Sequence, residues 1–197
     1  MKYQSTLLSI FLLICLTFLT SCGMQSIPTA LNQVDADWAE VQNQYKRRAD
    51  LIPNLVEVVK GYAAHEKETL TGVIEARAKA TAVNFTADQL NEANMKKFQE
   101  AQGGLSSALS RLMVTVEKYP DLKANENFRD LQGQLEGTEN RITVARNRYI
   151  EAIKNFNNLV TVPPTSFYNS LFLKHEKKPQ FAVENLQEVQ SAPKVKF

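Results

Sequence analysis

The chain has 197 residues, 44% of them hydrophobic and 22% charged, and its 23 basic and 21 acidic side chains leave a formal net charge of +2. This composition fits one globular domain and excludes a globally disordered chain, while the balanced, interspersed charge argues against a nucleic-acid partner, which needs a clustered basic face. Only seven glycines and seven prolines stand among many helix-favouring residues, so the sequence predicts an all-α protein.

The chain opens on an apolar leader. An apolar run of about 13 residues follows Lys2 and is too short to cross a bilayer as a helix; soon after it the sequence reaches LTSC, which ends at Cys22. That ending resembles the lipobox of bacterial lipoproteins. We therefore expect residues 1–21 to be a lipoprotein signal peptide and Cys22 to carry palmitate-type acyl chains that hold the protein on a membrane. An ordinary secretory signal and an uncleaved membrane anchor are the alternatives.

The residues around Cys22 also bear on location. The lipobox predicts a chain that faces the periplasm or the outside of the cell. In Gram-negative lipoproteins an Asp after the lipidated cysteine usually retains the protein at the inner membrane, so Gly23 favours the outer membrane for a Gram-negative source. The remaining cysteine, Cys15, lies within the leader, which excludes an intrachain disulfide in the mature chain.

A tether is expected at residues 22–30, followed by one helical domain over residues 31–197. The first helix is predicted from near Leu31 to about Val83, because apolar residues recur at steps of three and four: Trp38, Val41, Tyr45, Ile52, Leu55 and Val59. Pro53 conflicts with this helix, since a proline removes one backbone hydrogen bond and clashes with the carbonyl of Ala49. Either the helix is kinked at Pro53, or Asp50 caps a fresh helix there. The unbroken phase of the stripe favours the kink.

Two further long helices are predicted. Thr86 and Gln89 have the spacing of a capping box, which starts a second helix over residues 87–118. A third helix spans residues 124–160, and a short one is expected near 181–190 in the tail. Short links make neighbouring helices antiparallel, so the fold is an up-and-down bundle of three long helices, or a four-helix bundle if the first is broken at Pro53, with a short C-terminal segment.

Arginine and carboxylate side chains form the most informative polar set. Arg48 lies on the apolar stripe of the first helix, Arg77 continues it, and Arg47, Asp50 and Asn54 lie beside it. On the third helix Glu139 and Arg146 follow the core-facing edge. A buried arginine needs a partner, and Glu139 has the best placement for Arg48. The set is either a polar layer that fixes helix register, a ligand or partner site, or surface arginines that snorkel.

Catalytic and metal-binding patterns are weak. The two histidines, His65 and His175, do not form a zinc-binding pair, and Ser106, Ser107 and Ser110 lack the strand-turn-helix context of a nucleophile elbow. The sequence predicts no catalytic residue, no metal site and no cofactor.

The stretch RRADLIPNLVEVVKGYAAHE, residues 47–66, closely resembles the LemA family. The stretches LSSALSRL (105–112), EKYPDLK (117–123), EGTENRI (136–142) and PKVKF (193–197) match the rest of that family's pattern, although Ile150 and Phe156 replace a common Asn and Tyr. The resemblance implies an all-helical bundle outside the cytoplasm, usually on an uncleaved membrane helix, without an established catalytic activity.

These observations predict a function of protein contact. We expect a lipid-anchored envelope protein that acts as a helical scaffold or adaptor and is not an enzyme, with an unknown envelope protein as partner; homo-oligomers are compatible with this role. The alternative is a module that binds an anionic group at Arg47 and Arg48 near Pro53.

Overall fold

The computed structural model describes residues 25–181, and every regular element in that range is helical. In chain order these elements are α2 (Ser26–Tyr62), α3 (Lys67–Ala82), the 3-10 turn η1 (Ala87–Gln89), α4 (Glu92–Val116), α5 (Pro120–Ala124), α6 (Glu126–Thr161), α7 (Thr165–Tyr168) and the π-helical turn η2 (Asn169–Leu173). The leader, Cys22 and the tail beyond Phe181, which holds most of the helix expected near 181–190, lie outside the described residues.

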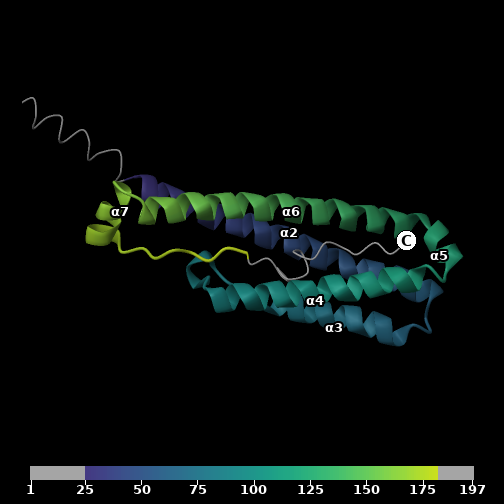
Figure 1. The fold of residues 1–197 in the computed structure, drawn as a ribbon. Helices are drawn as coiled ribbons and strands as arrows, with labels where there is room; N and C mark the ends of the chain where they lie inside the picture. The colour runs from purple at the N-terminus through teal and green to yellow at the C-terminus, as the bar shows by residue number, and fades with distance from the viewer. Residues whose placement is uncertain (1–24, 182–197) are drawn as a thin grey trace, which may run out of the picture.

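Four long helices, α2, α3, α4 and α6, run alternately up and down the molecule (Figure 1). The closest packing joins α2 to α6 and α3 to α4, so the bundle consists of two antiparallel pairs set against each other. The all-α bundle predicted from the sequence is confirmed. Within residues 25–181 no helix combines the length and the apolar character needed to cross a bilayer.

The first helix is shorter than predicted at one end and longer at the other. It ends at Tyr62, and the chain folds back so that α3 forms a separate helix; the prediction of one helix to about Val83 is wrong. Residues 63–66 contain neither glycine nor proline. Tertiary contacts stabilise the turn instead. Ala63 is buried, and the Tyr119 hydroxyl donates a hydrogen bond to Glu66 Oε1 at 3.0 Å. Folding back lets α3 bury its apolar positions within the bundle.

At its start, α2 begins at Ser26 rather than near Leu31, and Ile27 and Ala30 lie in the core although they were assigned to the tether. Farther along, α2 continues through Pro53. The alternative in which Asp50 caps a fresh helix is therefore wrong.

Asparagine side chains cap the two later helices. Asn91 Oδ1 accepts from the Asn94 amide at 2.8 Å, so α4 begins at Glu92, after the residue predicted from Thr86 and Gln89. Gln89 Oε1 does accept from the Thr86 amide, but this pair closes only the single turn η1. Asn125 Oδ1 accepts from the Phe128 amide at 3.0 Å and starts α6 close to its predicted position. Such caps satisfy backbone donors that have no partner inside the helix.

The apolar core has two clusters along the bundle axis. One lies at the end where α2 begins and α6 finishes and includes Trp38, Tyr149 and Phe156. The other lies at the opposite end and includes Leu55 and Leu105. The boundary between the clusters falls at the middle of the bundle, where polar side chains enter the core.

Candidate functional site

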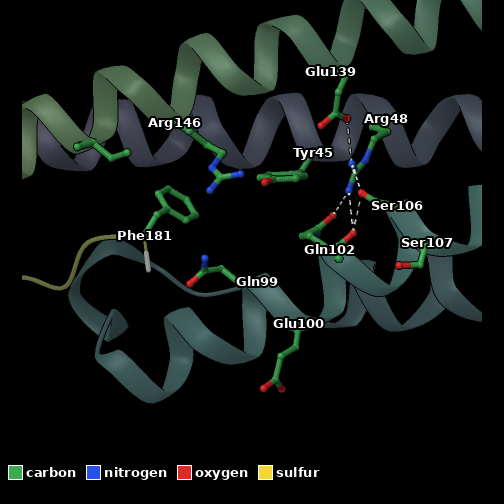
Figure 2. Close-up of a pocket in the computed structure, with 12 residues that line it drawn as sticks. Tyr45, Arg48, Gln99, Glu100, Gln102, Ser106, Ser107, Glu139, Arg146 and Phe181 are labelled. Carbon is green, nitrogen blue, oxygen red and sulfur yellow. Dashed lines mark hydrogen bonds and ion pairs between the residues drawn. The ribbon is translucent and has the colours of Figure 1, made fainter. Parts of the chain in front are cut away.

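A cleft of about 810 Å³ opens between α4 and α6 near the middle of the bundle. Figure 2 shows side chains from three helices converging on it, with Tyr45 and Arg48 reaching in from α2, Gln102 and Ser106 from α4, and Glu139 and Arg146 from α6. Phe181 lines one end of the cleft, where the described chain finishes. This site brings together three of the arginine and carboxylate residues singled out from the sequence.

Arg48 lies at the centre of this arrangement and is only 3% exposed. Its Nη1 donates to Glu139 Oε2 at 3.1 Å and to Ser106 Oγ at 3.0 Å. Its Nη2 donates to Gln102 Oε1 at 2.8 Å and to the Gln102 carbonyl at 3.3 Å. The guanidinium also lies 5.0 Å from the centre of the Tyr45 ring, within cation–π range. One arginine therefore links α2 to both α4 and α6.

The neighbouring polar contacts extend this layer to the fourth long helix. Gln102 Nε2 donates to the carbonyl of Ala80 on α3 at 3.3 Å. Arg48 lies between Tyr45 of one apolar cluster and Ile52 of the other, so the layer divides the core. We call Arg48, Gln102, Ser106 and Glu139 the polar layer. Within this layer Arg48 and Gln102 are buried, so a helix that slid along its neighbours would leave buried polar groups unpaired, which is costly.

In the Arg48–Glu139 ion pair, the arginine is buried and the carboxylate is exposed to solvent. The side chain of Arg48 is 4% exposed, whereas that of Glu139 is 57% exposed. Solvent screens such a carboxylate, so the pair is weaker than a fully buried one. Gln102 is buried, so its hydrogen bond with Arg48 is screened less by solvent than the contact of Arg48 with Glu139.

Arg77 occupies a second structural position. Its Nε donates to the carbonyl of Ala49 at 2.7 Å. This carbonyl would accept from residue 53 in a regular helix, but Pro53 has no N–H group. The side chain of a neighbouring helix thus replaces the hydrogen bond that Pro53 removes, which explains how α2 continues through the proline.

Arg146 lies on the other side of the cleft from Arg48. Its guanidinium is 4.6 Å from the centre of the Phe181 ring and faces the Tyr45 hydroxyl (Figure 2). Burial raises the pKa of Tyr45, and the positive charges of Arg146 and Arg48 oppose this rise. The Tyr45 hydroxyl is therefore neutral at physiological pH. Among residues 25–181, no carboxylate forms an ion pair with Arg146.

The remaining sequence candidates lie elsewhere. Arg47 is exposed and lines a separate hollow of about 430 Å³ with Arg129 and Arg141, so Arg47 and Arg48 do not share a site. Asp50 and Asn54 are exposed as well.

Three contributors to the cleft were missed in the sequence. Neither Gln102 nor Phe181 was singled out in the sequence, and Ser106 was considered only as a nucleophile. Gln102 falls at helical spacing between the apolar positions 98 and 105 of α4. A polar residue on an apolar stripe was the signal that could have found it.

Metal-binding groups do not gather in the described part of the chain: no cluster of three or more His, Cys, Asp or Glu side chains is found there. His65 is exposed, and His175 packs with its ring 5.9 Å from that of Phe156. The polar side chains of the cleft are engaged mainly in contacts that join helices.

Comparison with known proteins relates the chain to one family. The profile of the LemA family matches residues 37–197. Magnetosome protein MamQ of Magnetospirillum gryphiswaldense is 23% identical over 180 residues, which cover 82% of this chain and 66% of that protein. Magnetosome protein MamQ 2 of Paramagnetospirillum magneticum is 27% identical over 140 residues, 62% of this chain and 51% of the relative. Protein LemA of Metamycoplasma hominis is 24% identical over 136 residues, 66% of this chain and 58% of the relative. The chain spans about half the length of the Paramagnetospirillum relative.

Proposed function

Because this chain belongs to the LemA family, we propose that it is a lipid-anchored protein of the cell envelope that acts as a non-enzymatic helical scaffold through protein–protein contacts. The observation that carries the proposal is the polar layer: Arg48 joins α2, α4 and α6, and Gln102 joins α3. The buried polar side chains of Arg48 and Gln102 thus connect all four long helices and hold them in register. A scaffold needs such a rigid body more than it needs a reactive group.

The cleft is the surface that we assign to a protein partner. It is larger than the hollow at Arg47 and combines apolar walls at Ile150 and Phe181 with exposed polar groups at Ser106 and Ser107. A central apolar anchor with a polar rim is the usual anatomy of a protein interface. The proposed partner is an envelope protein, and neither a catalytic group nor a cofactor is part of this function.

The membrane attachment of the proposed scaffold depends on Cys22. In Cys22→Ala the acyl chains have no thiol to occupy. The protein is therefore expected either to become soluble after cleavage elsewhere, or to accumulate as a heavier precursor that keeps its leader. Cell fractionation with a mass measurement of the protein checks this. Cys15→Ala is the matched control, since Cys15 lies inside the leader and should leave both fraction and mass of the mature protein unchanged. If the Cys22→Ala protein stays in the membrane at its original mature mass, an uncleaved anchor replaces the lipid.

A second candidate function is binding of an anionic group, for which the exposed Arg47 is better suited than the buried Arg48. Arg47, Arg129 and Arg141 share one hollow with a single acidic residue, Asp130. Among the described residues these three arginines form no ion pair. A rise in melting temperature with pyrophosphate that Arg129→Ala and Arg141→Ala abolish would favour this alternative; an unchanged melting temperature would leave the scaffold.

A further inference from the structure

The end of the bundle formed by α7 and η2 carries an exposed apolar patch. Phe167, Leu171 and Phe172 are 67%, 70% and 68% exposed, and Val162 beside them is 53% exposed. Phe172 also lies against Tyr168, with ring centres 5.0 Å apart. We call Val162, Phe167, Leu171 and Phe172 the end patch. Large apolar side chains that gather on a surface mark a contact with a protein or a membrane.

Hydrogen bonds hold this turn in place, so the exposure of the end patch is built into the fold. The buried side chain of Asn169 donates to the His175 carbonyl at 2.9 Å and accepts from the His175 amide at 2.9 Å. Thr165 Oγ1 donates to the Leu159 carbonyl at 2.6 Å and ties the start of α7 to the end of α6. Hydrogen bonds from the buried Asn169 and the half-buried Thr165 therefore fix the backbone, while the apolar side chains of the end patch are exposed.

The position of the end patch is close to the expected lipid anchor. Figure 1 shows α7 at the end of the bundle where α2 begins. Only two residues lie between Cys22 and Gln25, where the described chain starts, so three residue-to-residue steps join them. An extended chain spans at most about 3.6 Å per residue, so this segment reaches no farther than about 11 Å. A lipid on Cys22 thus brings this end of the bundle to the bilayer surface.

We propose that the end patch is a second membrane contact, in which Phe167, Leu171 and Phe172 enter the interface of the bilayer that holds Cys22. This inference rests on the lipid anchor of the proposed function. The exposed charges next to the patch are Lys174, Glu176 and Lys177, with a net charge of only one, so apolar insertion contributes more than attraction to anionic headgroups. With the lipid on Cys22 and the end patch both in contact with the bilayer, the opposite end of the bundle, at α5, points away from the membrane.

Quenching by brominated lipids tests this contact in the full chain. The protein is purified from the membrane fraction and reconstituted in phosphatidylethanolamine–phosphatidylglycerol vesicles with brominated acyl chains. Leu171→Trp places a reporter in the end patch. Val114→Trp is the matched control, because Val114 is 69% exposed and lies near the other end of the bundle, two residues before the end of α4. The native Trp38 is buried in the core and gives both variants the same background.

We expect both variants to float with the vesicles and the Leu171→Trp reporter to be quenched at least twofold more than the Val114→Trp reporter. Adding Phe167→Ser and Phe172→Ser should reduce that quenching while flotation persists through the anchor. Equal quenching of the two reporters in floating protein would overturn the membrane contact and leave the anchor intact. A Leu171→Trp reporter shielded from aqueous acrylamide but not quenched by the lipid would overturn it too, and would assign the end patch to a protein. Protein that fails to float would contradict the anchor, and with it this proposal.

Discussion

Arg48→Ala is expected to lower the free energy of unfolding by about 3 kcal/mol. The substitution removes a buried stem, for which a large-to-small change costs roughly 2–5 kcal/mol, and it leaves Gln102 Oε1 without its donor in the core. Chemical denaturation of the purified protein measures the loss. Arg47→Ala is the matched control, since Arg47 is the preceding residue, carries the same charge and is exposed; its effect should stay within about 0.5 kcal/mol.

The polar layer can be separated from packing by a second pair of variants. Arg48→Met keeps most of the side-chain volume but still leaves Gln102 unpaired, so it should cost about 1–3 kcal/mol. Adding Gln102→Leu should recover much of this loss, because an apolar layer of similar volume often equals or exceeds a buried polar one in stability. If Arg48→Ala costs less than about 1 kcal/mol, or if Gln102→Leu deepens the loss in Arg48→Met, the polar layer does not organise the core as described.

Coupling between Arg48 and Glu139 is expected to be small. A double-mutant cycle should give no more than about 1 kcal/mol, because the Glu139 side chain is more than half exposed and its charge is screened. The coupling of Arg48 with the buried Gln102 should be larger. The reverse order would show that the ion pair dominates the layer.

Pro53→Ala is expected to raise the free energy of unfolding by about 1–2 kcal/mol. Pro53 is exposed, so its ring contributes little packing, and an alanine restores the backbone donor that the Ala49 carbonyl lacks. The gain is smaller than the roughly 3 kcal/mol cost of a proline in a helix interior, since Arg77 already occupies that carbonyl and proline also restricts the unfolded chain. Asn54→Ala, at the next exposed position, is the control and should change stability by less than about 0.5 kcal/mol.

The Pro53→Ala variant also serves as a background in which to test the role of Arg77. Arg77→Ala should cost about 1–2 kcal/mol in the natural chain and distinctly less in Pro53→Ala, because the carbonyl then has a backbone partner. Additive effects in this cycle would mean that Arg77 stabilises the bundle independently of the proline.

Much of the bundle could be predicted from apolar spacing. The stripe from Trp38 to Val59 indicated the buried face of α2 and correctly predicted that the helix continues through Pro53. The turn after Tyr62 could not be found in this way, because Ala63 and Leu70 are seven residues apart and stay in helical phase across the break. The turn depends on distant contacts such as Tyr119 with Glu66.

In the polar layer, only the pairing of Arg48 could be predicted from the sequence, because this arginine interrupts an apolar stripe. Arg48 stands on an apolar stripe, so a partner was required, and the placement of Glu139 made it the candidate that the structure puts 3.1 Å away. The contact of Arg77 with the Ala49 carbonyl was not predictable, since the backbone acceptor becomes available only through Pro53 and only once α3 has folded back. The end patch also escaped notice, because exposure is a property of the folded turn.

Photo-crosslinking in intact cells tests the proposed scaffold most directly. A photoreactive amino acid is placed at Ser107, on the exposed edge of the cleft, and in a second strain at Glu57, whose side chain is 72% exposed on α2 outside the cleft lining. The scaffold predicts that Ser107 gives a discrete adduct with one other envelope protein, that Glu57 gives much less of it, and that Cys22→Ala removes it by releasing the chain from the membrane. Irradiation that yields no protein adduct from Ser107, in a strain where the protein remains folded and membrane-bound, would contradict a scaffold that binds its partner through the cleft.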